Sequence, residues 1–233
     1  MFVMTMDQRA SSGGPDRVAA LVEGLNAPSA QGILRPFQRT AGDEVQGVVE
    51  LADTVVGIAL SAARSGHWSV GIGVGAVRRP LPAETRAGAG PAFEYAREAV
   101  ERAKHSSGRV AVSGPTPGAG HGESQDRNQA PNQDLNQTGE LLEAIEASLQ
   151  LLAELEFRRS AEGQEAGRWM DAGKTQREAA DELGVSQQAV SSRLRSGLWG
   201  ESRRLASVVS AMLERVDRLV EAAHEETDPG GQA

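Results

Sequence analysis

The sequence predicts an α+β fold in two parts, an N-terminal part that alternates strands with helices and a C-terminal part that is entirely helical. Apolar residues recur with strand or helix spacing up to residue 113, and with helix spacing alone from residue 140. Between them, residues 114–139 are rich in Gly, Pro, Asn and Gln and almost lack apolar side chains, which is typical of a flexible linker. We therefore expect two domains, 1–113 and 140–233.

The N-terminal elements follow one another in the order βαββαβ, with a further helix and strand appended. Strands are expected at 2–6, 33–39, 44–49, 67–77 and 109–112, and helices at 18–25, 51–59 and 91–104. This order favours a ferredoxin-like sheet with its helices on one side. Gly71, Gly73 and Gly75 in the fourth strand allow a close approach, either of a neighbouring element or of a ligand.

Composition limits the classes of function. The chain has 233 residues and a formal net charge of −8, which argues against a general nucleic-acid coat, so any DNA contact must be local and salt-dependent. It has no Cys, which excludes disulfides and thiolate metal sites. No signal peptide is evident and no apolar run approaches the roughly 18 residues of a membrane span, so we expect a cytoplasmic protein with no membrane partner.

The C-terminal part contains further amphipathic helices at 140–157, 161–172 and 201–223. The first and last of these each have a long apolar stripe. Such stripes suit packing of the two helices within one subunit, and they equally suit pairing with a second subunit. Both possibilities remain open from the sequence, and a homodimer is expected.

Residues 175–199 have the pattern of two short helices around a tight turn. The signals are a capping box, a glycine where the first helix must end, a second N-cap, and an apolar pair one turn apart: Thr175 with Glu178, Gly184, Ser186, and Val190 with Leu194. The pattern resembles the helix-turn-helix of sigma-like and response-regulator-like DNA-binding domains. The alternative is an ordinary helical hairpin.

The second helix of this pattern has an outward face without acidic residues. Gln can bond to adenine, Arg to guanine, and Ser to bases or phosphates, while two arginines further along could hold phosphates. The expected DNA-binding residues are Gln187, Gln188, Ser191, Ser192, Arg195, Arg203 and Arg204. The alternative interpretation of this face is a merely solvated surface.

The N-terminal part also resembles a known family. The βαββ unit, with Asp7 at the end of the first strand and Gly-Asp-Glu at 42–44 in the hairpin, resembles class III nucleotidyl cyclase and diguanylate cyclase (GGDEF-like) catalytic domains. More closely, residues 7–12, 16–17, 42–47, 71–77 and 90–104 are similar to the SatD family of bacterial proteins, some members of which end in a helix-turn-helix.

This resemblance implies a site and also a loss of activity. In the cyclases, two Asp carboxylates hold divalent cations such as Mg²⁺, which bind a nucleoside triphosphate, and Asp7 and Asp43 match those positions. Arg97 matches an Arg that steadies the transition state, but Phe93 stands where the cyclases have Asn, and Ala41 replaces the first Gly of the diguanylate cyclase signature. The resemblance therefore implies a degenerate domain that binds a nucleotide or mediates dimerisation, and no catalytic residue is assigned.

Together these observations predict a transcriptional regulator that binds double-stranded DNA and whose cyclase-like domain senses a nucleotide or dimerises. Two alternatives remain. The first is a metal-dependent nucleotidyl cyclase or related phosphoryl-transfer enzyme, and the second is a sigma-like factor that binds another protein. Turnover of ATP or GTP would favour the enzyme, whereas retention of specific DNA by the helical part would favour the regulator.

Overall fold

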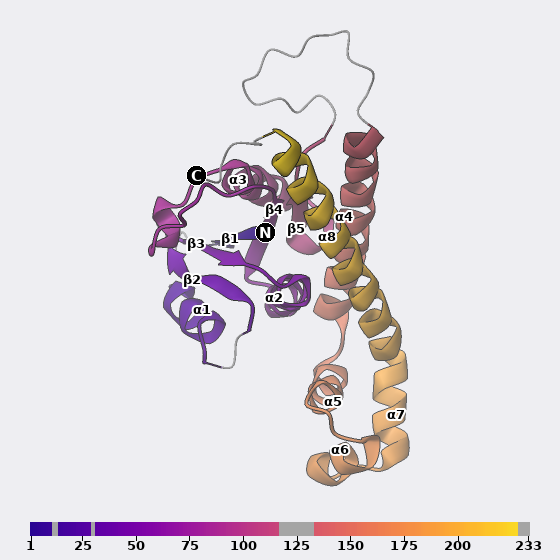
Figure 1. Ribbon diagram of the computed structural model, residues 1–233. Helices are drawn as coiled ribbons and strands as arrows, with labels where there is room; N and C mark the ends of the chain where they lie inside the picture. The colour runs from indigo at the N-terminus through magenta and orange to yellow at the C-terminus, as the bar shows by residue number, and fades with distance from the viewer. Residues whose placement is uncertain (11–13, 29–30, 117–132, 228–233) are drawn as a thin grey trace.

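The computed structural model describes residues 1–10, 14–28, 31–116 and 133–227 and shows a mixed α+β protein (Figure 1). It has one five-stranded sheet, and eight α-helices lie in these described ranges. Most of the expected linker, residues 117–132, lies outside them. The helix that was expected from Glu140 begins at Gln133, with Thr138 already buried in it.

The sheet is antiparallel apart from its last strand. Its strands are β1 (Phe2–Gln8), β2 (Ile33–Arg39), β3 (Glu44–Val49), β4 (Trp68–Val74) and β5 (Val110–Ser113). Their spatial order is β2-β3-β1-β4-β5. β1 lies antiparallel to both β3 and β4, β2 is antiparallel to β3, and β5 is parallel to β4. β1 is therefore the central strand, and its first and last residues lie at opposite ends of the sheet.

Helices cover both faces of the sheet. The helices α1 (Val18–Leu25) and α2 (Ala52–Ser65) share a core with alternate residues of β1 such as Met4 and Met6. The helix α3 (Pro91–Ala103) lies on the other face, where Phe93 packs with Val3 and Val48. The prediction that the helices share one side is therefore wrong.

The glycines of β4 explain why α3 lies there. A Cβ atom on Gly71 would lie 2.2 Å from the backbone nitrogen of Val100, and one on Gly73 would lie 2.1 Å from the backbone oxygen of Ala92. Only a strand without side chains on this face lets the helix backbone come so close. The sequence left open whether a neighbouring element or a ligand approaches these glycines, and the neighbouring helix α3 accounts for them.

Two long C-terminal helices pack on the α2 side of the sheet. The helices α4 (Gln133–Arg158) and α8 (Trp199–Thr227) run side by side in opposite directions (Figure 1). Leu149 and Leu152 of α4 and Leu213 of α8 belong to the same buried cluster as Val55 of α2. The apolar stripes thus lie against each other and the sheet domain, whereas an independent helical unit was expected from residue 140.

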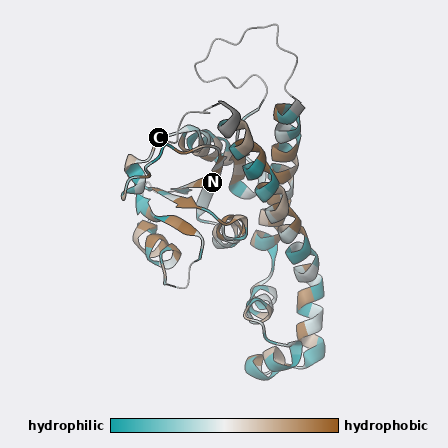
Figure 2. Ribbon diagram, viewed as in Figure 1, coloured by the Kyte–Doolittle hydropathy of each residue, from teal (hydrophilic) through white to brown (hydrophobic). Residues whose placement is uncertain are grey.

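Three short helices, α5 (Ala161–Asp171), α6 (Gln176–Leu183) and α7 (Gln187–Ser196), project beyond the sheet at one end of the α4–α8 pair (Figure 1). They have a small core of their own, which is formed by Ala166, Ala179, Ala180, Val190 and Leu194. Figure 2 shows that the outer surface of α6 is largely hydrophilic. None of the helices in the described part of the chain is long and apolar enough to cross a membrane.

Candidate nucleic-acid interface and sheet-edge site

The start of α6 is fixed by reciprocal capping. The Thr175 side chain accepts a hydrogen bond from the Glu178 backbone N–H at 3.2 Å, and the Glu178 carboxylate accepts one from the Thr175 backbone N–H at 2.7 Å. The Thr175 N–H, and the Thr175 hydroxyl at 2.9 Å, both donate to this carboxylate and lower the pKa of the Glu178 carboxyl below its ordinary value. The capping box expected from the sequence is confirmed, and it sets where the first short helix begins.

The turn between α6 and α7 follows from three residues. Gly184 ends α6 with a φ of 62°, a left-handed conformation that glycine adopts without strain. Ser186 caps α7 by accepting a hydrogen bond from the Ala189 N–H at 3.2 Å. Val190 and Leu194 then point inward and are buried against Ala179 and Ala180. The apolar pair therefore fixes which face of α7 is turned outward.

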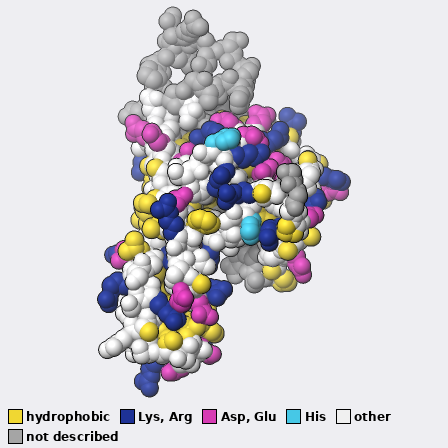
Figure 3. Space-filling model, turned by 180° about the vertical axis from the view of Figure 1, so that it is seen from behind, with side chains coloured by type: hydrophobic (Ala, Val, Ile, Leu, Met, Phe, Trp, Pro, Cys, Tyr) yellow, Lys and Arg dark blue, Asp and Glu magenta, His cyan; other side chains and the backbone are white. Residues whose placement is uncertain are grey.

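The outward face of α7 contains most of the expected DNA-binding residues. Gln187, Gln188, Ser192 and Arg195 are exposed, and Ser191 is half-buried. Ser192 also borders a hollow of about 620 Å³ between α7 and the start of α5. Figure 3 shows basic side chains interleaved with acidic ones over this end of the molecule. The α7 helix itself has two Arg and no acidic residue, so positive charge that would favour contact with DNA is confined to this helix.

The two arginines of α8 differ in their surroundings. Arg203 is half-buried and donates to both carboxylate oxygens of Asp171, each at 2.8 Å. It also lies 5.9 Å from the ring centroid of Trp199. Arg204 is exposed and lies 3.8 Å from Glu201. Because the Arg203 guanidinium already ties α8 to α5, the expected phosphate contact suits Arg204 better.

A buried ionic network, which sequence reasoning missed, joins this unit to the sheet domain. Fully buried Glu156 accepts two hydrogen bonds from Arg64 of α2, at 3.0 and 2.8 Å, and one from buried Arg159 at 2.7 Å. Arg159 in turn donates to the Gly197 carbonyl and the Ser202 hydroxyl, both at 3.0 Å. We call Arg64, Glu156, Arg159 and Ser202 the Glu156 network. The i,i+3 spacing of Glu156 and Arg159 was the available signal.

The two aspartates expected to hold a metal lie at the same end of the sheet. Asp7 and Asp43 line the same hollow of about 720 Å³, together with Lys104 and other residues. The Gln8 N–H donates to the Asp43 carbonyl at 3.2 Å, which fixes the hairpin beside the end of β1. Arg97 is exposed on α3 and is not among the residues that line this hollow. The structure therefore brings together two of the three residues.

Lys104 alters the electrostatics of this edge. Its ammonium lies 3.3 Å from the Asp7 carboxylate and 2.7 Å from Glu101. Burial raises the pKa of the Asp7 carboxyl, the charge of Asp43 acts in the same direction, and Lys104 opposes both. Hydrogen bonding to Glu101, and then to Asp7, raises the pKa of Lys104. The ammonium is therefore charged at neutral pH and partly balances the carboxylates.

These residues fit a resident divalent cation poorly. Mg²⁺ needs carboxylate oxygens directed at it, and at Asp7 it would have to displace the Lys104 ammonium. Arg9 and Arg109 add two more cationic side chains to the same hollow. Within the described ranges, no group of three or more His, Cys, Asp or Glu side chains could hold a metal ion.

Comparison with known proteins adds no relative from which a function could be inferred. No known protein family matches the chain, and no curated protein or solved structure is similar enough to count as a match.

Proposed function

We propose that this protein is a DNA-binding transcriptional regulator in which α6 and α7 form a helix-turn-helix and α7 reads the bases. One observation carries the proposal. Gln187, Gln188 and Arg195 are exposed on a helix whose opposite face is anchored by buried Val190 and Leu194. An exposed polar face on a rigidly held second helix is what major-groove recognition requires.

The chemistry of that face suits base readout. A Gln amide can bond to both hydrogen-bonding groups of adenine, and an Arg guanidinium to the two acceptors of guanine. Gln187 and Gln188 lie in the first turn of α7, the part that approaches base edges in helix-turn-helix complexes. Exposed Arg204 supplies a phosphate contact. Because the whole chain has a net charge of −8, we expect binding to weaken steeply with added salt.

We further propose that the regulator acts as a homodimer on an inverted-repeat site. Two copies of α7 would then lie roughly 34 Å apart, one turn of the DNA. Leu151 of α4 and Val208 of α8 are 56% and 54% exposed, which leaves apolar surface for a second copy. Analytical ultracentrifugation would test this, because a protein that stays monomeric on its operator contradicts the dimer.

The decisive experiment combines genome-wide mapping of bound sites with variants of α7. Gln188→Ala or Arg195→Ala should each weaken binding to a mapped site by about 1–3 kcal/mol if its side chain reads a base. Arg218→Ala is the matched control, because Arg218 is exposed on α8 and its ion pair with Glu214 is long, at 3.8 Å. Circular dichroism should show that all three variants remain folded. If both α7 variants bind as tightly as the parent, α7 is not the reader.

For the sheet domain we propose a ferredoxin-like, cyclase-like fold that either binds a nucleotide or mediates assembly. Mg²⁺ would accompany the nucleotide only if the ion displaces Lys104. A nucleotidyl cyclase is the second candidate function, and it is favoured by one observation, the shared hollow of Asp7 and Asp43. Metal-dependent turnover of ATP or GTP that disappears in Asp7→Ala and Asp43→Ala would establish the enzyme. No turnover in the parent, with nucleotide binding retained, would support the sensor.

A further inference from the structure

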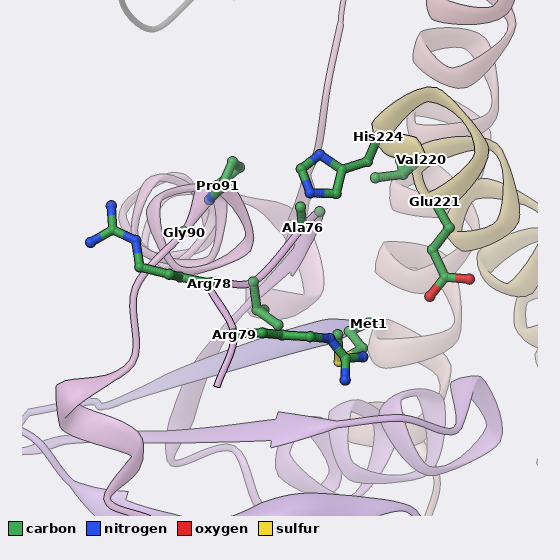
Figure 4. Close-up of a pocket in the computed structure, with 11 residues that line it drawn as sticks. Met1, Ala76, Arg78, Arg79, Gly90, Pro91, Val220, Glu221 and His224 are labelled. Carbon is green, nitrogen blue, oxygen red and sulfur yellow. The ribbon is translucent and has the colours of Figure 1, made fainter. Parts of the chain in front are cut away.

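A third hollow lies at the opposite end of the sheet from Asp7 and Asp43. It has a volume of about 750 Å³ and lies where the connection from β4 to α3 faces the last turns of α8 (Figure 4). Met1, at the start of β1, forms part of its wall, whereas Asp7 lies near the other end of that strand. Its size is within the range of small-molecule binding sites.

Opposite charges face this hollow from its two sides. Arg78 and Arg79 come from the β4–α3 connection, and Glu221 comes from α8. Figure 4 shows Arg79 extending toward Met1, Glu221 descending from α8, and the Arg78 side chain extending the opposite way from Arg79, away from α8. Among the residues that the structure describes, none makes a hydrogen bond or ion pair with these three side chains. Most other arginines of the sheet domain do have such partners, so this site is rich in unused hydrogen-bonding capacity.

The frame that presents the two arginines is fixed. The Arg78 N–H donates to the Ala89 carbonyl at 2.8 Å, and the Ala92 N–H donates to the Ala76 carbonyl at 3.1 Å. Gly90 has a φ of 126°, and a Cβ atom there would lie 2.9 Å from the Ala76 oxygen. Since the Ala92 amide at the start of α3 is already bonded, recognition of an anionic ligand depends on the Arg79 guanidinium.

We propose that this hollow binds a small molecule with an anionic group, a phosphate or a carboxylate, at one end and hydrogen-bond donors at the other. The guanidinium of Arg79 holds the anion, because the planar guanidinium matches the oxygen spacing of both groups. The Glu221 carboxylate accepts from the donor end. Val77, Pro91 and Val220 add apolar contact along the body of the ligand.

The position of the hollow gives the ligand a route to the DNA-reading unit. The α8 helix is continuous from Trp199, just after the end of α7, to His224 in the wall of the hollow. A ligand that bridges Arg79 and Glu221 therefore fixes the far end of α8 against the sheet domain. Its effect on DNA binding rests on the proposed function, whereas ligand binding itself does not.

Titration calorimetry on the full chain tests the site, with AMP and GMP as phosphate probes and L-glutamine as the carboxylate probe. Arg79→Ala should weaken binding of the responding probe roughly tenfold or more, since its charge-assisted hydrogen bonds to the anion are lost. Glu221→Gln should weaken the binding of AMP, GMP or glutamine. It should leave the binding of inorganic pyrophosphate unchanged, because pyrophosphate lacks the donor end. Arg17→Ala is the control, because Arg17 is also exposed and lies outside this hollow.

The outcomes separate this site from the others. Binding that is lost in Asp7→Ala, and retained in Arg79→Ala, would overturn the proposal and assign the ligand to the sheet-edge site. No binding of any probe at millimolar concentration would also overturn it. If calorimetry succeeds and the protein binds no DNA, the proposed function fails while the ligand site stands.

Discussion

Replacing Glu156 by Ala should cost more stability than any change to an exposed charge, because Glu156 is the centre of the Glu156 network. Its Oε2 atom accepts two hydrogen bonds from Arg64, and its Oε1 atom accepts one from Arg159. Arg203 lies 3.6 Å from the same Oε1 atom. Glu156→Ala would leave the Arg159 side chain, which is 1% exposed, without a carboxylate partner.

The size of the loss follows from this burial. Removing one partner of a buried ion pair costs about 3–5 kcal/mol, because the remaining charge stays out of water without compensation. Arg64→Ala should cost less, about 1–2 kcal/mol, because the Arg64 side chain is 25% exposed and Arg159 would still pair with Glu156. Since the two side chains touch, the double variant should lose less than the sum of the single losses.

Urea denaturation followed by circular dichroism measures these free energies of unfolding. Glu214→Ala is the matched control, because Glu214 is 56% exposed on α8 and its partner Arg218 lies 3.8 Å away. That control should change stability by no more than about 0.5 kcal/mol. If Glu156→Ala and Glu214→Ala unfold at the same urea concentration with equal slopes, the network does not stabilise the fold and the reasoning fails.

Three further results are expected. In α6, Glu178 has a pKa lowered below 4.5, so its capping contribution is present above that pH and is lost as the pH falls through the pKa of the folded state. The chemical shift of the Thr175 amide in an NMR titration should follow this loss, and Glu178→Gln should abolish the pH dependence of that shift. Gly73→Ala should destabilise by about 1–3 kcal/mol, because its Cβ would lie 2.1 Å from the Ala92 oxygen, whereas Gly57→Ala, with nothing within 4 Å, should stabilise slightly in thermal denaturation. Val190→Asp should unfold the α5–α7 unit in hydrogen exchange, and Ser192→Asp on the exposed face should not; equal protection in both variants would contradict the assigned inward face.

The local elements were predictable because their signals lie within a few residues. The strands at 33–39 and 44–49 have the expected bounds, since the hairpin turn at residues 40–43 separates them. The capping box and Gly184 were equally readable. Each of these features depends on backbone preferences and on neighbours close in sequence, so no knowledge of the tertiary fold was needed.

Features that depend on partners distant in sequence could not be predicted in the same way. The glycines of β4 indicate that another element approaches the strand closely. That this element is α3 depends on the path of the chain after residue 74. The apolar stripe of α4 could be recognised, but its docking against α2 could not, because an apolar face accepts any complementary surface. The same holds for Asp7: its place at the end of a strand suggests a metal ligand, but the Lys104 ammonium that lies 3.3 Å from its carboxylate comes from a distant part of the sequence.

Arg203 shows what this limit means for the candidate interface. An Arg close behind an exposed polar helix suggests a phosphate contact when only the sequence is known. In the fold, the same guanidinium bonds to Asp171 and lies near Glu156, so it connects α8 to α5 and to the Glu156 network. Because Arg159 also bonds to the Gly197 carbonyl at the end of α7, the orientation of α7 depends on buried charges next to the sheet domain. A change in Glu156 should therefore alter DNA affinity without touching the reading face, which links the stability of this junction to the proposed function.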